Sequence, residues 1–97
     1  MVSERSGIDM NGFVYIIQSQ SNGRYYIGSS NNIELRLQYH NNNWVTATKN
    51  RGPWVVRYAQ EYTDITTARK MENKLKQLKS RVIIEKIITD QRITIGE

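Results

Sequence analysis

The sequence contains no cysteine and only one histidine, His40. The absence of cysteine excludes disulfides, thiolate metal sites and thiol catalysis, and it suits a reducing compartment. A metal ion would therefore have to be bound by oxygen atoms or by the imidazole of His40.

Long apolar stretches are also lacking. No run approaches the roughly 20 apolar residues that a membrane-spanning helix needs, and residues 1–12 lack the apolar segment of a signal peptide. We expect a cytoplasmic protein that does not bind membranes. The 97 residues are enough for one hydrophobic core and too few for two. The polar residues 1–12 predict a flexible N-terminal arm, followed by one domain over residues 13–90 and a C-terminal tail over residues 91–97.

Acidic residues are few compared with basic ones. Nine Asp and Glu residues stand against 14 Lys and Arg residues, which gives a net charge of +5 and a pI near 9.7. Such a balance favours an anionic partner such as nucleic acid. Residues 69–81 carry six basic residues and one acid, Glu72. This segment is either a solvated helix face or a phosphate-binding surface. In the second case the residues that contact nucleic acid would be Arg69, Lys70, Lys76, Lys79 and Arg81.

Hydrophobic patterning predicts three strands and three helices. Residues 13–19 and 24–28 are short β-branched and aromatic runs separated by turn-forming residues, so they predict an antiparallel hairpin. Residues 54–62 have the composition of a third strand. The predicted helices cover about residues 32–41, the segment from Thr63 or Asp64 to about Lys79, and residues 81–90. The order ββαβαα predicts an α/β fold of the α+β kind, in which about three helices flank a small three-stranded antiparallel sheet.

Each predicted helix has an apolar stripe at helical spacing. In the first helix, Ile33 and Leu37 share their face with Arg36 and His40, whereas Leu35 points away. The inner residues of the second helix would be Ala68, Met71, Leu75 and Leu78. In the third helix, the pairs Ile83 with Ile84 and Ile87 with Ile88 recur every four residues, which strand alternation cannot explain.

Two polar side chains of the first helix thus lean toward the packed side. A buried charge costs free energy unless it is paired. One explanation is structural: Arg36 pairs with an internal carboxylate, and His40 closes the end of the helix. The other is chemical, because the hairpin brings Tyr15 and Tyr26 onto neighbouring strands near this helix. Two phenols, a guanidinium, an imidazole and a carboxylate suit phosphodiester hydrolysis. For the tyrosines, ordinary packing is the alternative, as it is for Trp54 and Tyr58.

Several segments, in order, resemble the GIY-YIG nuclease family: "FVYII", "RYYIGSS", "IELRLQYHN", "PWVVRYAQEY" and "ARKMENKLKQLKSR". The half-motif Tyr26-Ile27-Gly28 is intact and is followed by Ser30, where the family usually has Ser or Thr. In the first half-motif, Phe13-Val14-Tyr15 keeps the tyrosine and departs from Gly-Ile. The resemblance covers about residues 13–88, and it includes the N-terminal nuclease domain of the excinuclease C subunit, which implies branched or damaged DNA as substrate and a place in DNA repair.

The resemblance implies a role for each matching position. Tyr26 would be the general base or would orient the attacking water, and Tyr15 would assist near the scissile phosphate. Arg36 would stabilise the transition state. Glu72 would bind one Mg²⁺ or Mn²⁺, and its position four residues after Ala68 places it on the inner edge of its helix. His40 would have a proton-transfer or supporting role, or would simply pack.

We therefore expect a metal-dependent DNA endonuclease of one domain. Two alternatives stay open: a nucleic-acid-binding module that has lost its activity, and a nuclease subunit that needs a targeting partner. Gly28, which ends the predicted second strand, is interpreted as a turn residue close to the site.

Overall fold

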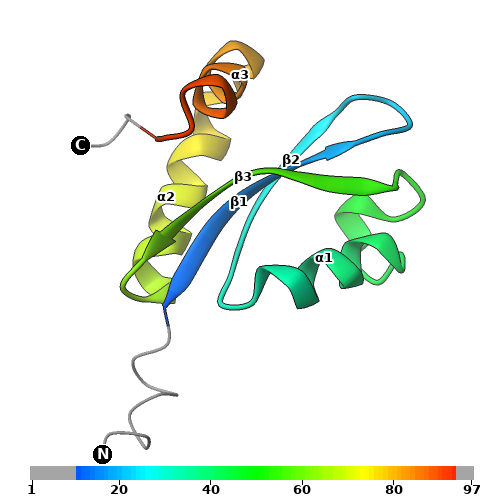
Figure 1. Ribbon diagram of the computed structural model, residues 1–97, viewed down its shortest axis with the longest axis horizontal. Helices are drawn as coiled ribbons and strands as arrows, with labels where there is room; N and C mark the ends of the chain where they lie inside the picture. The colour runs from blue at the N-terminus through cyan, green and yellow to red at the C-terminus, as the bar shows by residue number, and fades with distance from the viewer. Residues whose placement is uncertain (1–10, 94–97) are drawn as a thin grey trace, which may run out of the picture.

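The computed structural model describes residues 11–93, which form a three-stranded sheet with helices on both faces (Figure 1). Along the chain the elements are β1 (Gly12–Ser19), β2 (Tyr25–Ser30), α1 (Ile33–Asn41), a short 3₁₀ helix η2 (Thr46–Thr48), β3 (Trp54–Tyr62), α2 (Ile65–Leu78) and α3 (Arg81–Asp90). The predicted order ββαβαα and the antiparallel sheet are confirmed.

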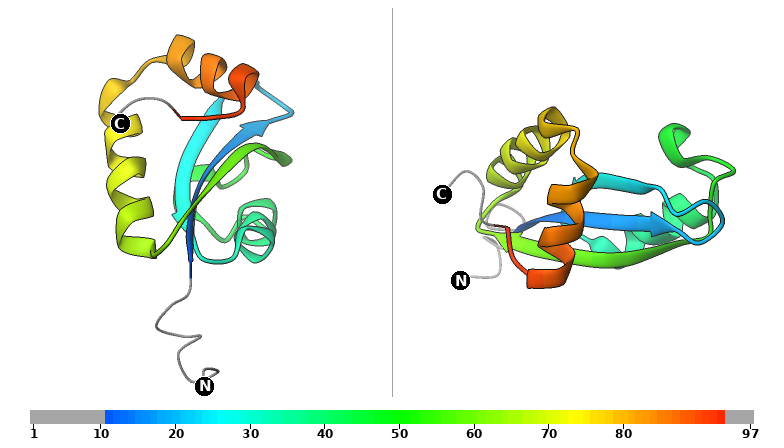
Figure 2. Two further views of the ribbon diagram at one scale, coloured as in Figure 1. Left: turned by 60° about the vertical axis from the view of Figure 1, so that its left-hand side comes forward. Right: turned by 90° about the horizontal axis from the view of Figure 1, so that it is seen from above.

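The sheet has the order β2-β1-β3, and both strand pairs are antiparallel. β1 lies in the centre, so both of its edges are paired. α1 packs on one face of the sheet, and α2 and α3 pack on the other (Figure 2). β2 is an edge strand, since its only partner in the sheet is β1.

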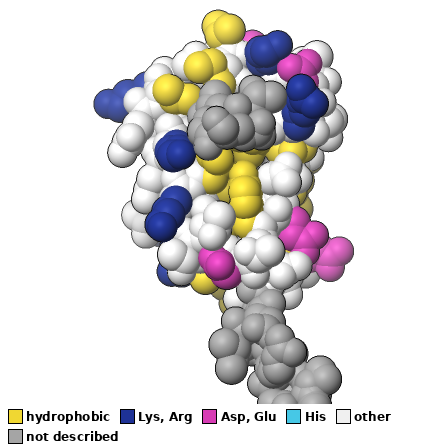
Figure 3. All heavy atoms as spheres, turned by 90° about the vertical axis from the view of Figure 1, so that its left-hand side faces the viewer, with side chains coloured by type: hydrophobic (Ala, Val, Ile, Leu, Met, Phe, Trp, Pro, Cys, Tyr) yellow, Lys and Arg dark blue, Asp and Glu magenta, His cyan; other side chains and the backbone are white. Residues whose placement is uncertain are grey.

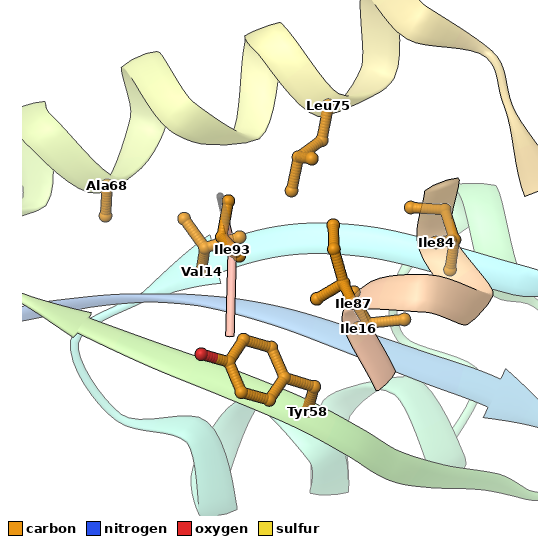
Figure 4. Close-up of a cluster of buried hydrophobic side chains, with 8 residues drawn as sticks. All are labelled: Val14, Ile16, Tyr58, Ala68, Leu75, Ile84, Ile87 and Ile93. Atoms are coloured by element: carbon orange, nitrogen blue, oxygen red, sulfur yellow. The ribbon is translucent and has the colours of Figure 1, made fainter. Parts of the chain in front are cut away.

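Strand alternation explains why β1 is apolar from Phe13 to Ile17, because successive side chains enter different cores. Val14 and Ile16 face α2 and α3, whereas Tyr15 and Ile17 face α1. Burial of each such aliphatic side chain stabilises the fold by about 1.5–3 kcal/mol. The larger core, drawn in Figure 4, consists of Val14, Ile16, Tyr58, Ala68, Leu75, Ile84, Ile87 and Ile93.

Each α-helix begins at a side chain that accepts a hydrogen bond from a free backbone N–H. Asn32 caps α1, Asp64 caps α2 and Ser80 caps α3. The bond from the Thr67 amide also lowers the pKa of the Asp64 carboxyl. Of the two residues at which the second helix was predicted to begin, Asp64 is therefore the capping residue and Thr63 is not.

Four details of the sequence prediction are wrong. Leu78 is 43% exposed instead of buried, because α2 ends there and Lys79 takes a left-handed conformation that turns the chain toward α3. β2 starts at Tyr25 and runs to Ser30, since Ser29 and Ser30 pair with β1. Gly28 therefore lies inside the strand and is not a turn residue. Between α1 and β3, where no helix was predicted, lies the short helix η2.

Residues on both sides of the predicted range 13–90 belong to the sheet or to the core. Gly12 begins β1, and Ile93 is buried in the larger core. Residues 1–10 of the predicted arm and residues 94–97 of the predicted tail lie outside the described residues. No helix within residues 11–93 has the length and apolar character required to cross a membrane.

Candidate active site at the β2 edge

The edge strand β2 contributes side chains to both faces of the sheet. Tyr15 pairs with Gly28 and Ile17 pairs with Tyr26, which places Tyr15 and Tyr26 on the α1 face. The neighbouring Ser29 projects to the other face, where it reaches α2. Groups from α1 and α2 can therefore meet around this edge, although the sheet separates the two helices.

Gly28 is required by the phenol of Tyr15, which lies against it. A Cβ atom added at residue 28 would be 2.4 Å from the hydroxyl oxygen of Tyr15 and 2.5 Å from Cζ. Such distances leave no room for any side chain. Glycine is thus needed at position 28 because the phenol of Tyr15 approaches its backbone closely, and not because of a positive φ angle.

The hydroxyl of Tyr15 is the end of a buried hydrogen-bond chain formed by Thr48, His40 and Tyr15. His40 Nε2 lies 2.8 Å from the Tyr15 hydroxyl, and Nδ1 lies 2.8 Å from the Thr48 hydroxyl. Thr48 donates to the carbonyl of Val45, so it accepts the Nδ1–H proton. His40 Nε2 is then free to accept the proton of Tyr15.

This chain removes one interpretation of His40, in which the residue closes the end of its helix. The residue is only 1% exposed, and its side chain points into the interior and does not close the end of α1. The sequence analysis missed Thr48. Thr48 lies in η2, and the path of the loop between α1 and β3 places this short helix beneath the imidazole.

Burial keeps both titratable members of the chain uncharged at neutral pH. It raises the pKa of Tyr15 to about 12, an effect that the nearby Arg36 guanidinium partly opposes. Burial, together with the smaller effect of the positive charge of Arg36, lowers the pKa of His40 to about 4. The pair is therefore a neutral phenol that donates to a neutral imidazole.

Tyr26 is the more accessible of the two phenols that were predicted to act in the site. Its side chain is half-buried, whereas Tyr15 is 2% exposed. The ring centroids of Tyr26 and His40 are 5.0 Å apart in an edge-to-face arrangement. On its open side, the Lys76 ammonium lies 5.4 Å from the ring centroid of Tyr26. Tyr26 therefore connects the buried chain to the surface.

Glu72 approaches the β2 edge from α2. Its Oε1 accepts a 2.5 Å hydrogen bond from the Ser29 hydroxyl, and its Oε2 lies 2.6 Å from Lys76 Nζ. The side chain is only 16% exposed, as expected from its position on the inner edge of α2. Ser29 is a further residue that the sequence analysis missed, because the predicted strand ended one residue before it.

Arg36 is half-buried on α1 and lies near the phenol of Tyr15. No carboxylate within residues 11–93 forms an ion pair with it, which removes the explanation by an internal salt bridge over the described part of the chain. Arg36 lines a hollow of about 290 Å³ together with Ser29 and Arg69. The guanidinium and the Glu72–Ser29 pair thus border one continuous surface.

The basic residues that were expected to contact nucleic acid fall into three places. Arg69 shares the hollow of Arg36, while Lys76, Lys79 and Arg81 line a second hollow beside Tyr26. Lys70 lies apart from both, in a hollow it shares with Lys74 and Arg92. Figure 3 shows several Lys and Arg side chains along the left edge of this face, and others at the upper right beside acidic side chains.

Glu72 is suited to a hard divalent cation, although the described residues contain no group of three or more potential His, Cys, Asp or Glu ligands. Mg²⁺ often binds through one carboxylate and keeps most of its waters, with substrate phosphate as a further ligand. The Lys76 ammonium at 2.6 Å shows that the carboxylate already attracts a positive charge on the open side of the site. The donor set therefore fits a single Mg²⁺ or Mn²⁺ ion.

Comparison with known proteins agrees with this geometry. The model of the GIY-YIG catalytic domain matches residues 11–87. The UPF0213 protein OB0043 of Oceanobacillus iheyensis is 33% identical over 72 residues, which cover 73% of this chain and 83% of that protein. The solution NMR structure of the UPF0213 protein BH0048 from Bacillus halodurans superposes with a TM-score of 0.52 at 26% identity, covering 82% of this chain and 84% of the other. The chain therefore belongs to the GIY-YIG family, a nuclease superfamily.

Proposed function

We propose that this protein is a metal-dependent DNA endonuclease that hydrolyses phosphodiester bonds. The observation that supports the proposal is a chain of contacts around the β2 edge, which runs from Glu72 through Lys76, Tyr26 and His40 to Tyr15, whose phenol lies near Arg36. Tyr26 contacts the imidazole of His40, and His40 follows Arg36 by one turn of α1. Tyr26 also contacts Lys76, which is paired with Glu72. These groups come from one strand and two helices on opposite faces of the sheet.

Each group has a role that follows from its exposure and chemistry. Tyr26 is accessible and orients or deprotonates the attacking water. Arg36 binds the phosphate, since a guanidinium can donate two parallel hydrogen bonds to its oxygens and stabilise the charge that develops there. Tyr15 is too buried to contact a phosphate extensively, so we assign it and His40 to positioning of Arg36 and Tyr26.

Glu72 would hold the divalent ion, and Ser29 would fix the orientation of its carboxylate. The ion, when bound, stabilises negative charge on the phosphate and on the leaving oxygen. Lys76 would move from Glu72 toward the substrate backbone when the ion binds.

Incubation of the protein with supercoiled plasmid tests the proposal. We expect nicking in Mg²⁺ or Mn²⁺ and none in EDTA, and a loss of at least about 100-fold in Glu72→Gln, which removes one charge and little volume. Asp90→Asn is the matched control, because it also breaks an i,i+4 ion pair on a helix. No nicking by wild type at any salt concentration, or equal nicking by Glu72→Gln, would refute the proposal and favour a binding module. Nicking without sequence preference would leave targeting to a partner protein.

A further inference from the structure

A second hollow adjoins the candidate active site, and the catalytic roles proposed above do not use it. It lies between the first half of β2 and the corner where α2 passes into α3, and its volume is about 410 Å³. Tyr26 and Lys76 belong both to this hollow and to the site. A strand bound at the site would therefore pass directly beside it. We call this hollow the aromatic pocket.

The floor of the aromatic pocket is apolar. Leu75 and Ile84 are almost fully buried, at 2% and 6% exposure, and Ile27 is half-buried. Water molecules form few hydrogen bonds with such a floor. A flat, weakly polar group would therefore displace these water molecules at a low free-energy cost.

The rim of the pocket is basic. Arg24, Lys76, Lys79 and Arg81 line it, and none of the described residues that line it is acidic. Glu85 lies just outside and pairs with Arg81 at 2.9 Å, which leaves Arg24 and Lys79 with no ion-pair partner within residues 11–93. The charge complements a polyanion whose backbone follows the rim.

One wall carries a stacked pair. The guanidinium of Arg81 lies 4.7 Å from the ring centroid of Tyr25, and Glu85 holds it there through a bond to Arg81 Nε. Tyrosine rings and guanidinium planes are the surfaces on which unpaired nucleobases stack. Neither Tyr25 nor Arg24 was marked by the sequence analysis as a functional residue.

We propose that the aromatic pocket is a nucleotide subsite that receives an unstacked base of the substrate strand. The base stacks against the Tyr25–Arg81 pair above the apolar floor, and Arg24 and Lys79 contact the phosphates on either side. This proposal rests on the proposed function for its ligand class, nucleic acid. It adds that the preferred substrate carries unpaired nucleotides beside the cleaved bond, because a base inside a continuous duplex cannot enter the pocket.

Fluorescence anisotropy with a labelled 20-nucleotide DNA tests this inference. Binding of the single strand and of its duplex is measured in EDTA at one fixed salt concentration, so that no cleavage is needed. Tyr25→Ala removes the stacking surface without a change of charge. We expect it to weaken single-strand binding by about 5-fold to 100-fold, the range for loss of one stacked base, and to change duplex binding by less than about 2-fold. Tyr25→Phe should bind like wild type.

A second pair of variants tests the cation. Arg81→Ala should weaken single-strand binding more than Lys86→Ala does, although both lose one positive charge and one i,i+4 ion pair on α3. Equal losses in the two variants would show general charge attraction only and would overturn the subsite, as would an unchanged single-strand affinity in Tyr25→Ala.

If Tyr25→Ala does not fold, the wild-type protein still decides the matter. Titration with the unlabelled single strand should shift the NMR signals of the Tyr25 ring, and unmoved signals would refute the proposal. Tyr25-dependent binding without any plasmid nicking would overturn the proposed function and leave the subsite standing. Nicking that does not depend on Tyr25 and shows no preference for unpaired DNA would overturn the subsite and leave the proposed function standing.

Discussion

Replacement of Gly28 by alanine should reduce cleavage through its effect on Tyr15. The new Cβ would lie 2.4 Å from the Tyr15 hydroxyl oxygen, whereas ordinary contact begins near 3.4 Å. The phenol must therefore retreat by about 1 Å. A shift of that size is too large for the 2.8 Å bond to His40 to keep its length and angle.

The expected losses differ for stability and for activity. Overpacking of a buried site costs about 1–3 kcal/mol of unfolding free energy. Tyr15 positions Arg36, and a displacement of such a group by about 1 Å lowers the cleavage rate on the order of 100-fold. Nicking of supercoiled plasmid measures the rate, and urea denaturation measures the stability.

A matched glycine control separates the two effects. Gly23→Ala introduces a side chain at a positive φ of 78° with no atom within 4 Å of the new Cβ, so it should lower stability and leave the nicking rate near wild type. The double variant Gly28→Ala with Tyr15→Phe should cut no more slowly than the slower single variant, since both act on one group. Full activity in Gly28→Ala, or independent losses in the double variant, would refute this reasoning.

Three further outcomes follow from the same geometry. Thr48→Val removes the acceptor for His40 Nδ1–H while keeping the volume; it should lower the unfolding free energy by about 1–3 kcal/mol and slow nicking, and Thr48→Ser should restore both. Unfolded His40 binds a proton below about pH 6.5, but the folded residue does so only below about pH 4. The unfolding free energy should therefore fall as pH drops from 6.5 to 4; urea denaturation at several pH values measures this, and a fall of the same size in His40→Gln would contradict it. Arg36→Lys should slow nicking by about 100-fold while DNA affinity stays within about 2-fold, since the charge remains and the paired hydrogen bonds do not; equal losses of rate and affinity would show a binding role only.

The element order and the inner faces of the helices follow from the sequence because local rules decide them, whereas the division of the interior into one core on each face of the sheet was not predicted. Alternation in β1, the capping residues and the four-residue repeat of isoleucines in α3 each have one consistent solution. The same rules place Arg36 and His40 on the inner face of α1 and Glu72 on the inner edge of α2, as the structure has them.

Contacts that depend on tertiary distance could not be predicted in this way. Thr48 comes under the imidazole only because the η2 loop folds back onto α1. Ser29 meets Glu72 because α2 crosses the end of β2. The need for glycine at position 28 comes from the phenol of Tyr15 in the neighbouring strand. None of these pairs shares a sequence period, so composition and spacing carry no signal for them.

Single-turnover cleavage of a labelled DNA in Mg²⁺ is the most direct measurement of whether the β2 edge is a catalytic site. Wild type should cleave, and Tyr26→Phe, Arg36→Ala and Glu72→Gln should each lose about 100-fold or more while they stay folded by circular dichroism. If all three folded variants cleave at the wild-type rate, the residues around this edge do not perform the reaction.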